Sequence, residues 1–148
     1  MAGKLDVSSA ARRLCERSGW KLTNLELQKM LYLAQMQFLG QTGERLVDES
    51  FEAWDYGPVS PCIYHQVKAF GSSAIKDVFH GAPPIIDQSI LNYIDSAYNS
   101  LSKYSAGKLV SITHWEDGAW AKNYIPNTKG VPIPDEDIIV EYKQRLTR

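Results

Sequence analysis

The sequence predicts a mainly α-helical protein, a single compact bundle of about six helices around a central apolar helix at about residues 24–39. Apolar residues recur at helical spacing in several segments, and capping residues or glycines mark the ends of those segments. The hydrophobic fraction of 44% and the length of 148 residues are those of one globular domain. We therefore expect a single domain over residues 1–148.

The first two helices are predicted from their apolar spacing and their end signals. A first helix is expected at about 7–18, where small and apolar residues recur at helical spacing before Gly19. Thr23 and Glu26 fit a capping box at the start of the second helix, and Gly40 is expected to end it. Apolar residues lie nearly all around this second helix, which is typical of a helix at the centre of its domain.

A short extended segment or a small two-stranded piece is expected near 46–57. Aromatic residues are frequent there, and the residue before a proline is biased toward extended backbone. Gly57 and Pro58 predict a turn. Ser60 can then cap a third helix, expected at about 61–70.

The second half of the chain predicts a loop and further helices. Residues 71–86 are rich in glycine, serine and proline, which is loop composition. Asp87 is expected to cap a fourth helix with a clean apolar repeat. A fifth helix is expected at about 105–114, followed by a brief helical turn, and Asp135 is expected to cap the last helix.

Charge and composition narrow the class of partner. The net charge is −1 and the one basic cluster is Arg12, Arg13 and Arg17, which argues against a nucleic-acid partner. The longest apolar-rich stretch, around 25–39, is interrupted by polar and charged residues and is not a membrane span. Cys15 and Cys62 form no CxxC motif and are expected to be free thiols in a reducing cytoplasm.

Three segments together resemble the Panacea domain family, which includes SocA-like antitoxins and phage-associated GepA-like proteins. These segments are residues 27–35, residues 51–61 with Tyr64, and residues 109–120 with Thr113 and His114. The most specific part is Glu-Ala-Trp at 52–54 followed by Gly-Pro-Val at 57–59. The resemblance covers roughly residues 5–125.

This resemblance implies a bacterial or phage protein that neutralises a cognate toxin by direct contact and is not an enzyme. It also implies that the toxin is encoded by an adjacent gene, and that some members deliver their toxin to a cellular AAA+ protease. A prophage accessory protein that binds a host protein is the alternative. The choice between the two depends on gene neighbourhood.

Two aromatic blocks are the candidate partner-binding residues. They comprise Trp54, Tyr56, Gly57, Pro58 and Tyr64 in the first block, and His114, Trp115 and Trp120 in the second. Aromatic side chains of low rotamer entropy dominate binding hot spots. The alternative is structural: Trp54 and Tyr64 would fill the junction between the extended segment and the third helix, and His114 would hold two short helices together.

The sequence evidence for catalysis, metal binding or cofactor binding is incomplete. Cys62 lies near a helix N-terminus, which lowers a thiol pKa, and His65 follows three positions later. A thiol hydrolase using Cys62 also needs an orienting group and an oxyanion site, and neither is visible, so we expect no catalytic residues. Two possible ligands do not make a zinc site, and no phosphate-binding glycine motif occurs. We therefore expect neither a metal nor a cofactor.

Acidic residues cluster at 48–55, just before the Gly-Pro turn. They are Asp48, Glu49, Glu52 and Asp55. Such a cluster either steers a basic partner surface toward the site or is a solvated loop. The sequence leaves both interpretations open.

Overall fold

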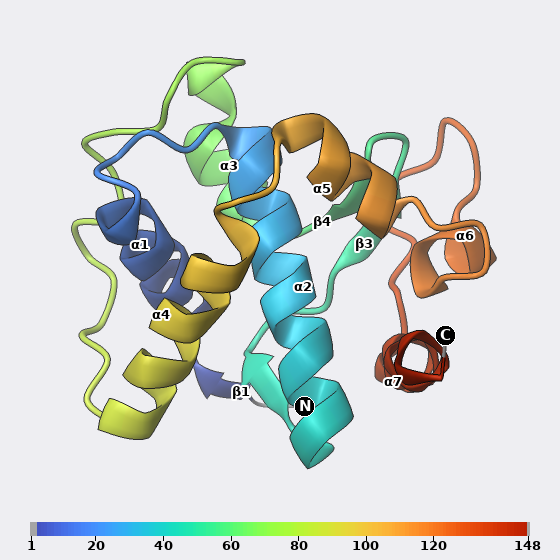
Figure 1. Ribbon diagram of the computed structural model, residues 1–148. Coiled ribbons are helices and arrows are strands. Elements are labelled where there is room, and N and C mark those ends of the chain that lie inside the picture. The colour runs from blue at the N-terminus through green and yellow to red at the C-terminus, as the bar shows by residue number, and fades with distance from the viewer. Residues whose placement is uncertain (1–2, 148) are drawn as a thin grey trace.

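The computed structural model describes residues 3–147, so residues 1, 2 and 148 of the expected domain lie outside the described residues. Between Gly3 and Thr147 it contains seven α-helices, a short 3-10 helix and four short strands (Figure 1). The helices are α1 (Val7–Arg17), α2 (Asn24–Thr42), α3 (Pro61–Val67), η1 (Lys68–Phe70), α4 (Gln88–Leu101), α5 (Ala106–Thr113), α6 (Ala119–Asn123) and α7 (Asp135–Leu146). The strands are β1 (Gly3–Leu5), β2 (Arg45–Val47), β3 (Glu52–Trp54) and β4 (Gly57–Val59). The predicted mainly helical class is confirmed.

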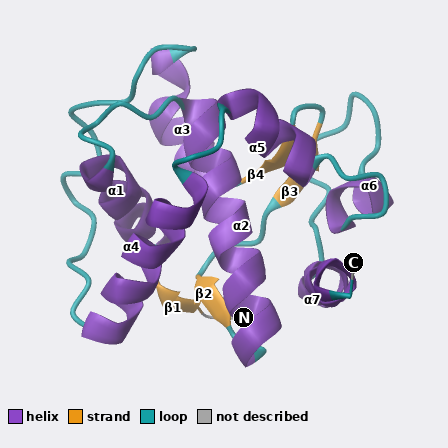
Figure 2. Ribbon diagram, in the orientation of Figure 1, coloured by secondary structure: helices purple, strands orange, loops and turns teal. Residues whose placement is uncertain are grey.

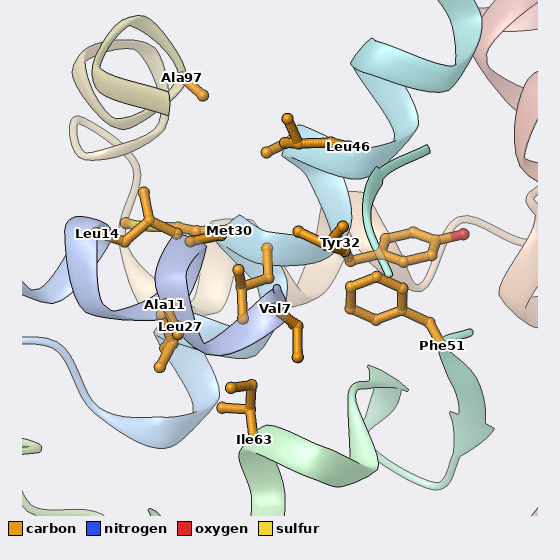
Figure 3. Packing of buried hydrophobic residues seen from close by; sticks show 14 of the residues in the cluster. Val7, Ala11, Leu14, Leu27, Met30, Tyr32, Leu46, Phe51, Ile63 and Ala97 are labelled. Atoms are coloured by element: carbon orange, nitrogen blue, oxygen red, sulfur yellow. The ribbon is translucent and has the colours of Figure 1, made fainter. Parts of the chain in front are cut away.

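Helix α2 runs through the middle of the molecule. Figure 1 shows α1 and α4 together on one side of it and α6 and α7 on the other, with α2 contacting α1, α4, α5 and α7. The Thr23–Glu26 capping box predicted at its start is present. In the core, the rings of Tyr32 and Phe51 meet edge to face with centroids 5.4 Å apart (Figure 3). The apolar residues all around α2 are thus buried by neighbours on several sides.

Helix α2 does not end at Gly40, as the sequence predicted, but continues to Thr42 and is capped by Gly43. Gly40 instead lies at the contact between α2 and α7. A β-carbon at this position would overlap the ring of Tyr142. The glycine therefore permits close approach of α7 to α2 instead of stopping the helix.

Three polar residues inside α2, Gln28, Lys29 and Gln35, are buried and bind backbone groups of neighbouring segments. The Gln35 side chain accepts hydrogen bonds from Leu46 N (2.9 Å) and Val47 N (3.0 Å) and donates one to Val47 O (3.4 Å). An amide offers both a donor and an acceptor, so it pairs with a strand as another strand would. Gln35 thereby attaches β2 to the central helix.

The strands form two small sheets (Figure 2). Strands β3 and β4 pair antiparallel, with Trp54 opposite Gly57, which confirms the small two-stranded piece expected near 46–57 and extends it to Val59. Strand β1 pairs parallel to β2, with Leu5 opposite Val47. This second pair was not predicted.

The last helix differs from the sequence prediction at its first residue. Its N-cap is Pro134, and Asp135 is the first helical residue instead of the cap. Asp135 accepts a hydrogen bond from Arg45 Nε at 2.8 Å, which ties the start of α7 to β2. Within residues 3–147, no helix combines the length and hydropathy needed to cross a membrane.

Candidate functional site

The site is built on the β3–β4 hairpin, whose turn is Asp55-Tyr56. Gly57 follows the turn with a φ of 110°, a backbone conformation that side chains disfavour. A β-carbon on Gly57 would also lie 2.9 Å from both Lys29 Nζ and His114 Nε2. Glycine is thus required for conformation and for space, because the hairpin lies directly on two polar side chains.

Lys29 and Gln28 of α2 hold the hairpin and the start of α3 from beneath. Lys29 is 1% exposed, and its Nζ donates to Pro58 O at 3.3 Å. Burial lowers the pKa of Lys29 to about 8. The Gln28 amide pairs with both backbone groups of Ser60, accepting from its N at 2.8 Å and donating to its O at 3.3 Å. The segment Gly57 to Ser60 is therefore fixed to the central helix.

Three aromatic rings stack beside the hairpin. The ring centroids of His114 and Trp120 are 4.2 Å apart, and those of Trp120 and Tyr124 are 4.6 Å apart. Trp120 Nε1 donates to Trp54 O at 2.8 Å. The stack from α5 and α6 is thereby joined to the end of β3.

The surroundings of His114 disfavour the positively charged form of its ring. Burial lowers its pKa, and the nearby Lys29 charge lowers it further, although a backbone hydrogen bond with Tyr56 opposes the shift. Its Nε2 is buried, and no residue among those described forms a hydrogen bond with it. A neutral, stacked ring is therefore the state that this environment favours.

The outer side of the hairpin carries an aromatic pocket of about 510 Å³. Trp54 and Tyr64 form its base, with rings edge to face and centroids 4.8 Å apart. Lys129 Nζ lies 4.4 Å from the Trp54 ring centroid and 5.6 Å from that of Tyr64. Tyr56, 77% exposed, stands at the rim. The pocket thus combines three aromatic rings with an internal cation.

The acidic residues around the hairpin have structural partners. Glu52 Oε1 accepts from Trp54 Nε1 (2.8 Å) and Gly130 N (3.2 Å), and Asp55 Oδ1 accepts from Tyr124 Oη (2.6 Å) and Asn127 N (3.2 Å). The hydrogen bond from Tyr124 is the main cause of the lowered pKa of Asp55. These two carboxylates bind the 124–130 segment to the hairpin.

The other two acidic residues of the 48–55 cluster cap helices. Asp48 Oδ1 accepts from Val7 N at 3.0 Å, at the start of α1. Glu49 Oε2 accepts from Ser60 Oγ at 2.6 Å and Cys62 N at 3.1 Å, at the start of α3. The cluster is therefore more than a solvated loop, because its four carboxylates bind the starts of two helices and the 124–130 segment.

Seven of the eight predicted residues come together. Trp54, Tyr56 and Tyr64 line the pocket, while Gly57, Pro58, His114 and Trp120 form the layer beneath and beside it. Trp115 does not line the pocket. Its ring lies 4.8 Å from the Arg145 guanidinium, which is bound to Glu141 of α7 at 2.7 Å.

Cys62 does not have the activated thiol that its helix position suggested. Partial burial raises its pKa, and the Glu49 charge raises it further, outweighing the hydrogen bond from Gln66 Nε2 at 3.5 Å. His65 instead lies against the Tyr64 ring, with centroids 5.7 Å apart. Across residues 3–147, no group of three His, Cys, Asp or Glu side chains is placed to hold a metal ion.

Sequence reasoning missed Lys29, Tyr124 and Lys129. The sequence does contain a signal for Lys29, namely its position inside an apolar helix. A buried ammonium requires a polar partner, so this position indicates a contact with another segment. Nothing local marks Lys129, which reaches the pocket only because Asp55 and Glu52 hold its loop against the hairpin.

Fold and site together define a small, mainly helical domain in which a hairpin and an aromatic surface are fixed to a buried central helix. The family model described as "Antitoxin SocA-like, Panacea domain" matches residues 27–121. The chain belongs to this family. The matched residues include both predicted aromatic blocks and end before Lys129.

One curated relative matches strongly. The chain is similar to "Antitoxin SocA" of Caulobacter vibrioides (strain NA1000 / CB15N), with 37% identity over 109 residues. The match covers 67% of this chain and 58% of the relative, so the chain spans less than two thirds of that protein's length. None of the solved structures compared with the chain matches it.

Proposed function

We propose that this protein is a non-enzymatic antitoxin that binds a protein toxin directly in the cytoplasm. Membership of the SocA-like Panacea family and the 37% identity to an antitoxin support this role. The contact face that we propose consists of the β3–β4 hairpin, α3 and the loop at 125–130. We call it the hairpin face.

The exposure of Tyr56 is the observation that carries the choice of this face. Tyr56 is 77% exposed at the tip of a hairpin whose backbone is held by Lys29, Gln28 and Trp120. A large aromatic side chain on a rigid support loses little conformational entropy on binding. Such a residue is suited to be a binding hot spot.

The toxin that we propose is the product of an adjacent gene. Co-expression of this protein should restore growth to cells that express the toxin, and the two proteins should co-purify at a fixed stoichiometry. Each neighbouring gene product is tested in turn as the candidate toxin. If this protein restores growth against none of them, the antitoxin role is ruled out. Copurification with a host protein instead would support the accessory role.

Delivery of the toxin to an AAA+ protease is a further part of the proposal, implied by the family resemblance. It predicts that the cellular half-life of the toxin shortens when this protein is present. The shortening should disappear in cells that lack the protease. An unchanged half-life with restored growth would indicate inhibition by binding alone.

A further inference from the structure

The aromatic pocket of the hairpin face contains a cation of the protein itself. Lys129 Nζ lies 4.4 Å from the Trp54 ring centroid and 5.6 Å from that of Tyr64, distances at which an ammonium is attracted to a ring face. Within residues 3–147, no carboxylate lies at ion-pair distance from this ammonium. Lys129 is therefore held by the attraction of the two ring faces and, at longer range, by the negative charge of Asp55.

The surroundings of the pocket favour positive charge. Glu52 accepts a hydrogen bond from the Trp54 indole, which places a carboxylate on the edge of the ring that Lys129 covers. Asp55 lines the pocket, and its lowered pKa keeps it ionised. Both hydrogen bonds to Asp55 fall on Oδ1, and Oδ2 receives none from the described residues.

The Lys129 side chain can leave the pocket without opening the loop. The backbone on either side is fixed, because Asn127 N is bound to Asp55 and Gly130 N to Glu52. The side chain itself is exposed and is held by ring contacts and by the longer-range attraction of Asp55. A change of rotamer is enough to free the two ring faces.

The pocket also has room that Lys129 does not use. About 510 Å³ remains open with Lys129 in place, bounded by Tyr56, Tyr64 and Thr128 among others. Tyr56 borders this space with most of its surface in solvent. A second side chain can therefore enter between the hairpin and the loop.

We propose that this pocket is a recognition site for a lysine side chain of a protein partner, and that Lys129 is an internal competitor which the incoming ammonium displaces. The proposal rests on the proposed function only in taking the toxin as that partner. Two ammonium groups repel each other, so the rings of Trp54 and Tyr64 accommodate one at a time. Displacement makes binding selective, because a neutral side chain cannot replace the attraction that Lys129 loses.

A small probe tests the pocket without a toxin. Nα-acetyl-lysine-N-methylamide is titrated into the ¹⁵N-labelled protein, and the indole N–H resonance of Trp54 is followed by NMR. The uncharged norleucine analogue serves as the matched probe. Lys129→Ser empties the pocket, and Lys103→Ser is the matched control, since Lys103 Nζ lies 5.9 Å from the Tyr104 ring centroid elsewhere on the surface.

The expected result is a saturable shift of the Trp54 resonance with the lysine probe and none with the norleucine probe. Lys129→Ser should lower the half-saturating concentration by roughly three- to tenfold, because the competent pocket is then fully populated. Lys103→Ser should leave it unchanged. Adding Tyr64→Leu to Lys129→Ser should remove the shift, with folding checked by thermal unfolding.

Several outcomes would overturn the proposal. They are no saturable shift in Lys129→Ser, an equal shift with norleucine, or an equal gain in Lys103→Ser. Choline binding much more tightly than the lysine probe would assign the pocket to a small quaternary ammonium ligand instead. These results do not depend on toxin neutralisation: a lysine-selective pocket without growth rescue would contradict only the proposed function, and rescue without probe binding only this inference.

Discussion

Trp120 Nε1 donates a hydrogen bond to the carbonyl oxygen of Trp54 at 2.8 Å, across 66 positions of sequence. This contact joins the second aromatic block, at the start of α6, to the end of β3 in the first. The two blocks predicted separately from sequence are therefore parts of one structure. Trp54 thus lines the pocket and also accepts a hydrogen bond from Trp120 through its backbone.

Trp120→Phe should destabilise the protein by about 1–2 kcal/mol, because it removes this hydrogen bond and leaves a carbonyl group less well paired. The stacking with His114 and Tyr124 should remain. Urea unfolding measures the change. Tyr56→Phe, which removes a hydroxyl from an exposed ring, should have no measurable effect, and equal losses in both variants would contradict the role given to Trp120.

Gly57→Ala should destabilise the protein by about 2 kcal/mol or more, since it combines a φ of 110° with a β-carbon 2.9 Å from Lys29 Nζ and His114 Nε2. Gly43→Ala is the matched control. Gly43 also has a positive φ, but nothing lies within 4 Å of its β-carbon position, so it should lose only about 1 kcal/mol. Thermal or urea unfolding compares the two, and similar losses would show that the contact beneath the hairpin does not matter.

Gln35→Leu should cost about 3 kcal/mol, because it leaves Leu46 N, Val47 N and Val47 O without their buried partner. Gln37→Leu makes the same change on an exposed position of the same helix and should be nearly neutral. Urea unfolding of both variants decides between them. A small loss for Gln35→Leu would mean that β2 is held mainly by its apolar contacts.

Lys29 should make stability depend on pH above neutrality. Its folded pKa of about 8 lies below the ordinary value of 10.5, so the unfolded state binds more protons between these values. The penalty of burying the charge is complete below pH 8 and is relieved as the pH rises toward 10.5.

The matched measurement compares wild type with Lys29→Met. Between pH 7.5 and 9.5, wild type should gain about 2 kcal/mol of unfolding free energy relative to the variant. Other titrating groups, including Tyr32 with its raised pKa, cancel in the difference. Parallel pH profiles of the two proteins would contradict a buried Lys29 with a lowered pKa.

Helices with a clean apolar repeat, such as α1 and α4, could be predicted from sequence because one face alone decides their burial. The orientation of α2 could not. Its polar residues Gln28, Lys29 and Gln35 look like a solvent-facing interruption, yet all are buried as partners of backbone groups. A hydrophobic-periodicity pattern treats these residues as solvent-facing. In the structure they bind backbone groups of segments that follow later in the chain.

The site was partly predictable for a similar reason. Large aromatic residues beside a Gly-Pro turn indicate a rigid, partly exposed surface, and Trp54, Tyr56 and Tyr64 do line one pocket. The pairing of β1 with β2 and the placement of Lys129 depend on long-range contacts of short segments, which have no local periodicity. Helix position suggested a lowered pKa for Cys62, but partial burial and the Glu49 charge raise it, and neither can be read from the local sequence.

The central claim is that the hairpin face is the surface that binds the toxin. The direct test is the dissociation constant of the toxin complex for Tyr56→Ala and Ile86→Ala, both of which truncate exposed apolar side chains, 77% and 90% exposed. Neither should change stability measurably. Tyr56→Ala should weaken binding at least about tenfold and Ile86→Ala should leave it unchanged; wild-type affinity in Tyr56→Ala would contradict the account.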